Sequence, residues 1–313
     1  MHTTWPSGQV LRMGSHFSLE PRAVSVHSVF HSALNLIDES NSLYTLVMHR
    51  EQLHPCSALV SFSDPSSGFD ELEFTQAEEG MFKEGELFFD CGIWVSCKGA
   101  KRVHPSEEVP PQLASVDVSY LRSQMRILSG LQQEKQTALA VEALFAPTSE
   151  LNTISNLVSF NAKLLKKSVQ TTDSALARRG LEGLLGLGPG ATPSGDDFIC
   201  GFFLALHMCQ SSSFGQDLQS YYSAITKTLS SLIRKPIPIT TDISLQLLGL
   251  ASEGLFSQPL IAMAKSFSSH GADRSSWEAL AAYGHSSGLD AGLGFLFALS
   301  VLLPDFEYKG EVC

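Results

Sequence analysis

Residues 185–207 read LGLGPGATPSGDDFICGFFLALH and decide the fold of the second part of the chain. Residues 186–195 hold four glycines and two prolines in ten positions. No regular helix or strand accommodates that density of glycine and proline, so the sequence predicts a shaped loop. Residues 198–209, which follow, are apolar on every side, and this predicts a helix buried in a protein core.

The glycine-rich loop is a candidate site for an anion. A loop that leads into the N-terminus of a buried helix leaves backbone N–H groups free at the positive end of the helix dipole. We therefore expect residues 188–194 to bind a phosphate or carboxylate. The loop is not the P-loop of nucleotide-hydrolysing enzymes, because no lysine follows its glycines.

Two adjacent carboxylates, Asp196 and Asp197, stand at the start of the helix and would repel a bare anion. They fit a functional site if they hold Mg²⁺ that bridges to a phosphate, or if they accept hydrogen bonds from a substrate amide. The alternative is structural. Ser194 precedes Asp197 by three positions, a spacing that resembles a capping box.

A second stretch repeats the first. Residues 194–206 read SGDDFICGFFLAL and residues 287–299 read SGLDAGLGFLFAL, with seven of thirteen positions identical. We infer two buried helices with similar caps, Ser194 with Asp197 and Ser287 with Asp290, whose N-termini meet at one pocket. The alternative is that two core helices share a common type of start without sharing a site.

Other polar residues near these helices are weaker candidates. His285 suits a general acid or base at neutral pH, and a purely structural histidine fits the sequence equally well. Thr240 and Thr241 precede another apolar segment, and we expect one of them to cap its helix. Asn35 is the polar residue of a short apolar run near the start of the chain, and we expect it to make a turn hydrogen bond.

The composition changes near residue 105, which predicts two domains. Short runs rich in Val, Phe, Tyr and Thr lie before it, for example at residues 42–48, 57–63, 71–75 and 92–96. They predict an antiparallel, barrel-like β domain at residues 1–105. A proline-rich stretch at 104–111 is the expected linker. Helical periodicity then predicts a mostly α-helical domain at residues 106–313, with helices at 119–144, 156–177, 216–233, 243–253, 259–268 and 277–283.

Composition and charge exclude several classes of protein. The 313 residues are 43% hydrophobic and carry a net charge of −11, which argues against nucleic-acid binding and against docking on an anionic membrane. The longest apolar runs are shorter than a membrane span, and no secretory signal is visible, so we expect a cytoplasmic protein. Six cysteines without metal-site spacing predict free thiols and no metal ligands among them.

Four motifs together resemble a known family. The segments GLGPGATPSGDD, TTDIS with LASEGLFSQPL, GHSSGLDAGLGF and VFHSALNLIDESNSLYTL are similar to the AllH-like subunit of oxamate carbamoyltransferase. The resemblance runs from about residue 26 to residue 303 and is weakest in the middle of the N-terminal domain. It implies a role in carbamoyl transfer between oxamate and carbamoyl phosphate, in allantoin breakdown, together with two other subunits. The α+β fold class itself is predicted by the change of composition near residue 105. Members of the family can have histidine at the position of Gly195, so glycine here indicates a different substrate or a non-catalytic branch.

The candidate residues overlap the shared motifs. The expected catalytic residues are Asp196, Asp197, His285 and Asp290. The expected substrate-binding residues are Gly188, Gly190, Thr192, Ser194, Gly195, Thr240, Thr241, Ser286 and Ser287. No cofactor is required by the sequence, although Mg²⁺ is compatible with it. The expected partners are a small anionic substrate and the other subunits of a carbamoyltransferase. The competing hypothesis is a non-catalytic binding module for a small metabolite that bears a phosphate or carboxylate.

Overall fold

The computed structural model of the chain describes residues 7–62, 68–72, 74–75, 77–103, 112–113, 115–145, 153–210, 216–235, 237–303 and 306. The chain forms two compact units, Met1–Glu108 and Val109–Cys313. Each unit has its own hydrophobic core. The expected linker at residues 104–111 lies outside the described residues.

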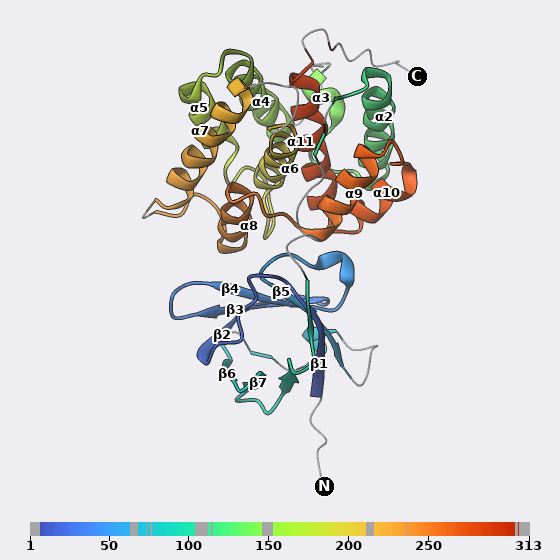
Figure 1. Cartoon of the computed structure of the whole chain (residues 1–313). Helices are drawn as coiled ribbons and strands as arrows, with labels where there is room; N and C mark the ends of the chain where they lie inside the picture. The colour runs from blue at the N-terminus through green and yellow to red at the C-terminus, as the bar shows by residue number, and fades with distance from the viewer. Residues whose placement is uncertain are drawn as a thin grey trace. The chain divides into compact units, whose positions relative to one another are not determined.

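The first unit is built from β-strands (Figure 1). The strands are β1 Ser7–Met13, β2 Arg22–Val29, β3 Ala33–Asp38, β4 Leu43–Val47, β5 Ser57–Phe62, β6 Glu79–Lys83, β7 Glu86–Phe89, β8 Trp94–Ser96 and β9 Lys101–Arg102. Neighbouring strands follow the order β5-β4-β3-β2-β6-β7-β8-β1, and pairing of β1 with β5 closes this sheet into an eight-stranded barrel. The pairs β4–β5, β1–β8 and β1–β9 are parallel, and the other pairs are antiparallel.

The barrel encloses an aromatic core. Burial alternates along strands such as β6, whose side chains are exposed and buried in turn. Phe17 packs edge-to-face against both Tyr44 and Phe82, with ring centroids 5.8 Å apart in each case. The alternation places one set of side chains inside the barrel, which is why short strands of β-branched and aromatic residues close on themselves here.

Two expectations for the first unit are wrong. Asn35 does not lie in a turn, because it is a buried residue of β3. Its amide group donates to Ser28 at 3.0 Å and accepts from Thr45 at 2.8 Å, so cross-strand hydroxyls satisfy it. The strand expected at residues 71–75 is absent from the described part of that segment, where Phe69–Glu71 form a 3-10 helix.

The second unit is helical. Its helices are α2 Val118–Lys135, α3 Val141–Phe145, α4 Thr153–Thr171, α5 Ser174–Leu184, α6 Ser194–Cys209, α7 Gln216–Ile233, α8 Asp242–Ser252, α9 Gln258–Ser268, α10 Arg274–Ala281 and α11 Ser287–Val301. The predicted α+β architecture, a barrel-like domain followed by a mostly helical one, is confirmed.

Two predicted helices each turn out to be a pair. The segment 119–144 breaks after Lys135, where Gln136 adopts a left-handed conformation with φ of 52°. The segment 156–177 breaks at Thr172, also left-handed, and Asp173 then caps α5 by accepting from the backbone of Ala175 and Leu176. Helical periodicity continues across both breaks, so only the local caps mark them. The helix predicted at 216–233 has the same bounds as α7.

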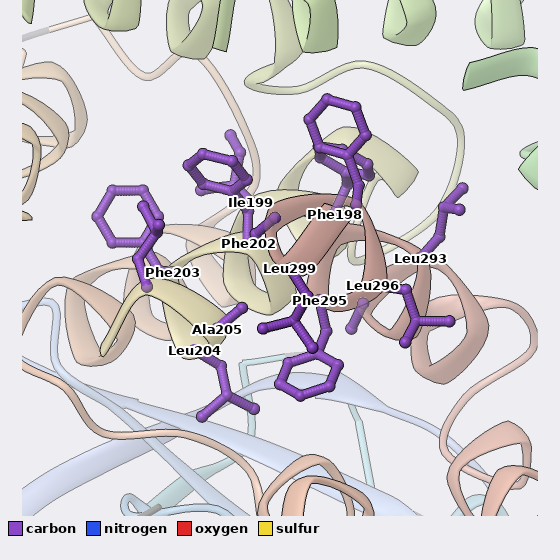
Figure 2. Close-up of a cluster of buried hydrophobic side chains, with 14 of the residues drawn as sticks. Phe198, Ile199, Phe202, Phe203, Leu204, Ala205, Leu293, Phe295, Leu296 and Leu299 are labelled. Carbon is purple, nitrogen blue, oxygen red and sulfur yellow. The ribbon is translucent and has the colours of Figure 1, made fainter. Parts of the chain in front are cut away.

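Helices α6 and α11 form the centre of the helical unit (Figure 1). They approach closely through two glycines, as a Cβ atom on Gly201 would lie 1.7 Å from the carbonyl oxygen of Ala291, and one on Gly294 would lie 2.0 Å from that of Phe198. Figure 2 shows the buried apolar side chains that both helices contribute around this contact. In addition, α6 packs against α5, α7 and α8, whereas α11 packs against α2, α4, α9 and α10.

None of the helices in the described residues is long and apolar enough to cross a membrane. The five cysteines within the described ranges are free thiols, as expected, and they are Cys56, Cys91, Cys97, Cys200 and Cys209.

Candidate functional site

The glycine-rich loop between α5 and α6 follows a backbone path that requires glycine. Gly188 has φ of +123° and Gly190 has φ of +101°, a region that residues with a side chain rarely adopt. At Gly188 space is also limiting, because a Cβ atom would lie 2.8 Å from the backbone nitrogen of Ser194. Gly188 therefore lets the loop fold back onto the start of α6.

Asp196 joins this loop to the segment before α8 through hydrogen bonds. Its Oδ1 accepts from the backbone N–H of Gly186 at 2.9 Å, and its Oδ2 accepts from the hydroxyl of Thr240. Burial raises the pKa of Asp196, while the hydrogen bonds from Thr240 and Gly186 oppose that rise. Because both carboxyl oxygens are engaged, Asp196 is suited to shaping the loop.

Two further hydroxyl groups hold the loop against the starts of α8 and α11. Thr241 is the N-cap of α8, as predicted, and accepts from the backbone N–H of Ser244 at 3.2 Å. Its hydroxyl also donates to the carbonyl oxygen of Ala191 at 2.5 Å. The hydroxyls of Thr192 and Ser287 lie 2.7 Å apart. The structure thus brings the loop and the N-terminal ends of α6, α8 and α11 together.

The caps expected at Ser194 and Ser287 are wrong. Pro193 is the N-cap of α6 and Ser286 is the N-cap of α11, and neither helix has a side-chain hydrogen bond at its cap. Pro193 supplies the extended backbone of a cap position, with ψ of 143°, so the helix already includes Ser194. The hydroxyls of Ser194 and Ser287 are therefore available for contacts between the two helices.

Several backbone N–H groups at the loop have no acceptor in the part of the chain that the structure describes. Within the described residues, no hydrogen bond is made by the N–H groups of Gly188, Gly190, Ala191, Thr192 and Ser194. They lie beside the start of α6, where the helix dipole is positive. Consecutive free N–H groups in glycine conformations of this kind form an anion-binding surface.

Asp197 of α6 and Asp290 of α11 form a buried pair of carboxyl groups. Asp197 is 5% exposed and Asp290 is 0% exposed. Their hydroxyl neighbours are exchanged between the helices, since Ser287 of α11 faces Asp197 and Ser194 of α6 faces Asp290. The sequence repeat is therefore matched by a reciprocal arrangement in space.

Both members of the pair hold their protons unusually tightly. Burial raises the pKa of Asp290 to about 7, against the opposing effect of Ser194 and Ser286. Burial, and after it the charge of Asp290, raise the pKa of Asp197 well above its usual range. Hydroxyl groups near the pair, those of Ser287 and Thr192 at Asp197 and those of Ser194 and Ser286 at Asp290, oppose the rise. Oδ2 of Asp197 and both oxygens of Asp290 nevertheless have no hydrogen-bond partner of good geometry among the described residues. The pair therefore retains a proton near neutral pH and leaves three oxygens uncommitted.

Sequence reasoning missed two neighbours of the pair, Cys200 and Tyr283. Burial is the main cause that raises the pKa of each group, and the charge of Asp197 is the second cause. Both are protonated at neutral pH and can donate hydrogen bonds. Cys200 follows Asp197 by three positions on a helix, a spacing that places the two on one face and could have indicated it. No sequence signal indicated that Tyr283 lies near Asp197.

Two candidates lie apart from this cluster. His285 is exposed in the turn before α11, and no contact within the described residues joins its ring to the aspartates. At Gly195 a Cβ atom would lie 2.0 Å from the carbonyl oxygen of Leu184, the last residue of α5. A histidine at this position would therefore need the end of α5 to move.

The cluster offers oxygen ligands for a hard cation. Two carboxyl groups with hydroxyls nearby match the way Mg²⁺ binds when a substrate phosphate completes its coordination. Among the described residues, a group of three possible metal ligands occurs only in the barrel unit, where His31, Asp70 and Glu71 are all exposed.

Comparison with protein families gives two matches. The family described as oxamate carbamoyltransferase subunit AllH matches residues 184–299, which include the loop, α6 and most of α11. The AllH family N-terminal domain matches residues 9–102, the barrel. Neither the curated proteins nor the solved structures compared with the chain gave a match.

Proposed function

The chain belongs to the family of the oxamate carbamoyltransferase subunit AllH, and from this we propose that it works as one subunit of a carbamoyltransferase that acts on oxamate and carbamoyl phosphate. In the proposed reaction the amide nitrogen of oxamate attacks the carbamoyl carbon. The bond from that carbon to the phosphate oxygen breaks, and the proton lost by the nitrogen leaves with the phosphate. The pathway we propose for it is allantoin breakdown, with the other subunits of the transferase as partners.

One structural observation supports this proposal in addition to the family membership. The free N–H groups of the loop lie at the start of α6, next to a pair of buried carboxyl groups with uncommitted oxygens. Oxamate and carbamoyl phosphate each join an anionic group to a carbamoyl group. An array of N–H donors suits the anionic group, and in acyl transfer it also stabilises charge on the leaving phosphate.

The candidate residues take different roles in this proposal. Gly188, Gly190, Thr192 and Ser194 contribute N–H groups or shape for the anion. Asp196, Thr240 and Thr241 position the loop through the hydrogen bonds already described. Asp197 and Asp290 orient the carbamoyl group or hold Mg²⁺, with Ser286 and Ser287 beside them.

The contacts found around Asp196, Asp197 and Asp290 come from hydroxyl, thiol, phenol and backbone groups. A transferred phosphate usually meets an arginine or lysine as well. A positive side chain from a partner subunit would supply this charge, which supports the proposal that the chain is active only in a complex. The same observation is equally compatible with the competing function, a module that binds an anionic metabolite without turning it over.

An assay of phosphate release from carbamoyl phosphate, with oxamate as acceptor, tests the proposal. It is run on the purified chain and on the chain recovered with its partners from native cells, each with and without a chelator of divalent cations. We expect oxamate-dependent release in the recovered complex, and loss of that release in a complex that carries Gly188→Ala. Absence of release from the chain and from the complex would contradict the carbamoyltransferase proposal and leave the binding module as the better account.

A further inference from the structure

Three large apolar side chains form a row on the outer surface of the barrel. Met81 of β6 lies opposite Phe88 of β7, and Phe88 lies opposite Trp94 of β8. The three side chains are 44%, 44% and 37% exposed, whereas the residues on either side of each along its strand are buried. Because paired residues of adjacent strands lie side by side on one face of a sheet, the three form a continuous surface, which we call the apolar row. Exposed apolar surfaces of this kind mark interaction sites.

An acidic hollow adjoins the apolar row at Met81. The hollow has a volume of about 440 Å³ and lies over β2, β3 and β6. It forms because two outward residues of β2, Ala23 and Ser25, are small, while Ile37 of β3 and Met81 of β6 on either side are large. Met81 lines the hollow and also belongs to the apolar row, so the two features make one surface.

Four carboxylates line the hollow, and they are Asp38, Glu39, Glu79 and Asp90. The guanidinium group of Arg22 lies 3.6 Å from the carboxylate of Asp38 and compensates its charge. The other three are exposed and form no ion pair with a described residue. The hollow therefore presents uncompensated negative charge directly beside an apolar surface.

The strands under this surface limit how a partner can bind. Each of β6, β7 and β8 is hydrogen-bonded to a strand on both sides, so a partner cannot add a strand here and must bind through side chains. The apolar row crosses three strands, about 10 Å at the usual strand spacing, and a small cation in the hollow would leave Phe88 and Trp94 uncovered. Methionine, phenylalanine and tryptophan are typical of the centre of protein interfaces. The surface therefore fits a protein partner.

We propose that this surface docks another subunit of the transferase, through a segment that places an arginine or lysine in the acidic hollow and apolar side chains on the apolar row. The inference rests on the proposed function, because it takes the chain to be one subunit of a complex. The negative charge of the hollow attracts a basic segment and repels nucleic acids and anionic membranes. Burial of the apolar row supplies the favourable free energy of the contact.

The stability of the complex recovered from native cells with the full-length chain tests the inference. The double variant Glu79→Lys with Asp90→Lys reverses the charge of the hollow, and Phe88→Ser removes the centre of the apolar row. Mass photometry of the diluted complex gives its apparent dissociation constant. We expect either change to raise this constant at least about tenfold, because rim charges attract the partner and a buried aromatic residue dominates such contacts.

Two control variants carry matched changes at other exposed positions. Glu51→Lys with Glu71→Lys reverses two exposed carboxylates in the 3-10 helices of the barrel unit, and Phe160→Ser removes a phenylalanine of α4 that is 60% exposed. Both should leave the dissociation constant unchanged. Circular dichroism establishes that each variant is folded, which we expect because all the altered side chains are exposed.

Photo-crosslinking identifies the occupant of the surface. The photoreactive residue p-benzoylphenylalanine replaces Phe88 in the full chain, and mass spectrometry maps the peptide that it labels in the assembled complex. We expect a peptide of another subunit that contains arginine or lysine beside apolar residues. A crosslink to a second copy of this chain or to its own residues 1–6, no crosslink in the complex, an unchanged dissociation constant in either variant, or recovery of the chain without other subunits would each overturn the inference.

The outcomes separate this inference from the proposed function. Oxamate-dependent phosphate release by a complex whose assembly is unaffected by the variants would leave the function standing and remove the docking surface. Weakened assembly in the variants and a crosslink to another subunit, in a complex without phosphate release, would leave the docking surface standing and remove the transferase proposal.

Discussion

The N-terminal ends of α6 and α11 have the same sequence features and the same packing, and they differ in the segment that precedes each helix. Both helices begin with serine and glycine, and the two glycines pack against a backbone carbonyl of the preceding helix, Gly195 on Leu184 and Gly288 on Leu280. Both helices place an aspartate in the buried pair. The α6 side alone adds a glycine-rich loop with free N–H groups.

The third position of the repeat differs between the two helices, and this position is where α6 binds its loop. Asp196 on α6 corresponds to Leu289 on α11. Asp196 binds the backbone of Gly186 and the hydroxyl of Thr240, and so holds the loop in its shape. Leu289 is buried and cannot do so. The comparison indicates that the shared features build the helix pair, whereas the features unique to α6 build the anion site.

The largest effect is expected from Asp290→Asn as pH changes. Asp290 keeps its proton to about pH 7 in the folded chain, while its ordinary pKa is 3.8. The folded state therefore binds more protons between these values, and the stability contributed by Asp290 falls as pH rises from about 4 to about 7. Asparagine removes this loss, so relative to the wild type the variant should gain up to roughly 4 kcal/mol over that range, at ~1.4 kcal/mol per pKa unit.

Urea unfolding of both proteins at pH 4.5, 6 and 8 measures this gain. The exposed-site variant Glu182→Gln serves as the control and should show no such trend. A difference between Asp290→Asn and wild type that does not change with pH would show that Asp290 is ionised in the folded chain.

Replacing a contact glycine by alanine, in α6 or in α11, tests whether the two helices contribute equally to the stability of their packing. Gly201→Ala and Gly294→Ala each place a methyl group within 2.0 Å or less of a backbone carbonyl oxygen. Each should lower the free energy of unfolding by about 3 kcal/mol, because α6 and α11 must move apart. Gly130→Ala in α2, where nothing lies within 4 Å, should instead be neutral or stabilise by up to ~1 kcal/mol. Chemical denaturation compares the free energy of unfolding of the three variants. A clearly larger loss for one of the two contact glycines would show that α6 and α11 do not contribute equally.

Removal of the cap at α8 probes the contacts that only the α6 loop has. Thr241→Ala loses the N-cap hydrogen bond and the bond to Ala191, so we expect a loss of about 1–2 kcal/mol in unfolding free energy. We also expect faster amide hydrogen exchange in the loop. Unchanged exchange at residues 188–192 would mean that the loop keeps its shape without Thr241.

The smallest effect is expected at the corresponding cap position of α11. Ser286 has no side-chain hydrogen bond as an N-cap, so Ser286→Ala should change the free energy of unfolding by no more than about 0.5 kcal/mol. Thermal unfolding measured beside Thr241→Ala provides the contrast. A loss as large as that of Thr241→Ala would show that the start of α11 depends on its cap in the same way as α8.

The sequence predicted the regular parts of the fold well. Short runs rich in Val, Phe, Tyr and Thr indicated the β-rich first domain, and helical periodicity located α7. The two buried helices were indicated by stretches that are apolar on every side. The cap at Thr241 was also readable, because a threonine before an apolar helix is a local signal. Asn35 was misread, since its partners Ser28 and Thr45 come from neighbouring strands that local sequence does not reveal.

The candidate site was predictable in outline and not in its connections. The repeated S-G-x-D motif predicted two related helix starts that meet at one pocket, but each start was expected to carry its own local cap. The structure instead exchanges Ser194 and Ser287 between the helices, which depends on the close packing of Gly201 and Gly294. Such a contact joins residues far apart in the chain, so it cannot be read from spacing alone.

The most direct test of this account is an amide-resolved NMR titration of the isotopically labelled chain with oxamate. We expect the backbone signals of Gly188, Gly190, Thr192 and Ser194 to shift together with those around Asp290, and Gly188→Ala to weaken these shifts. Saturable shifts confined to the barrel residues 7–103, or the same shifts in Gly188→Ala, would contradict a ligand site on the α6 half of the repeated scaffold.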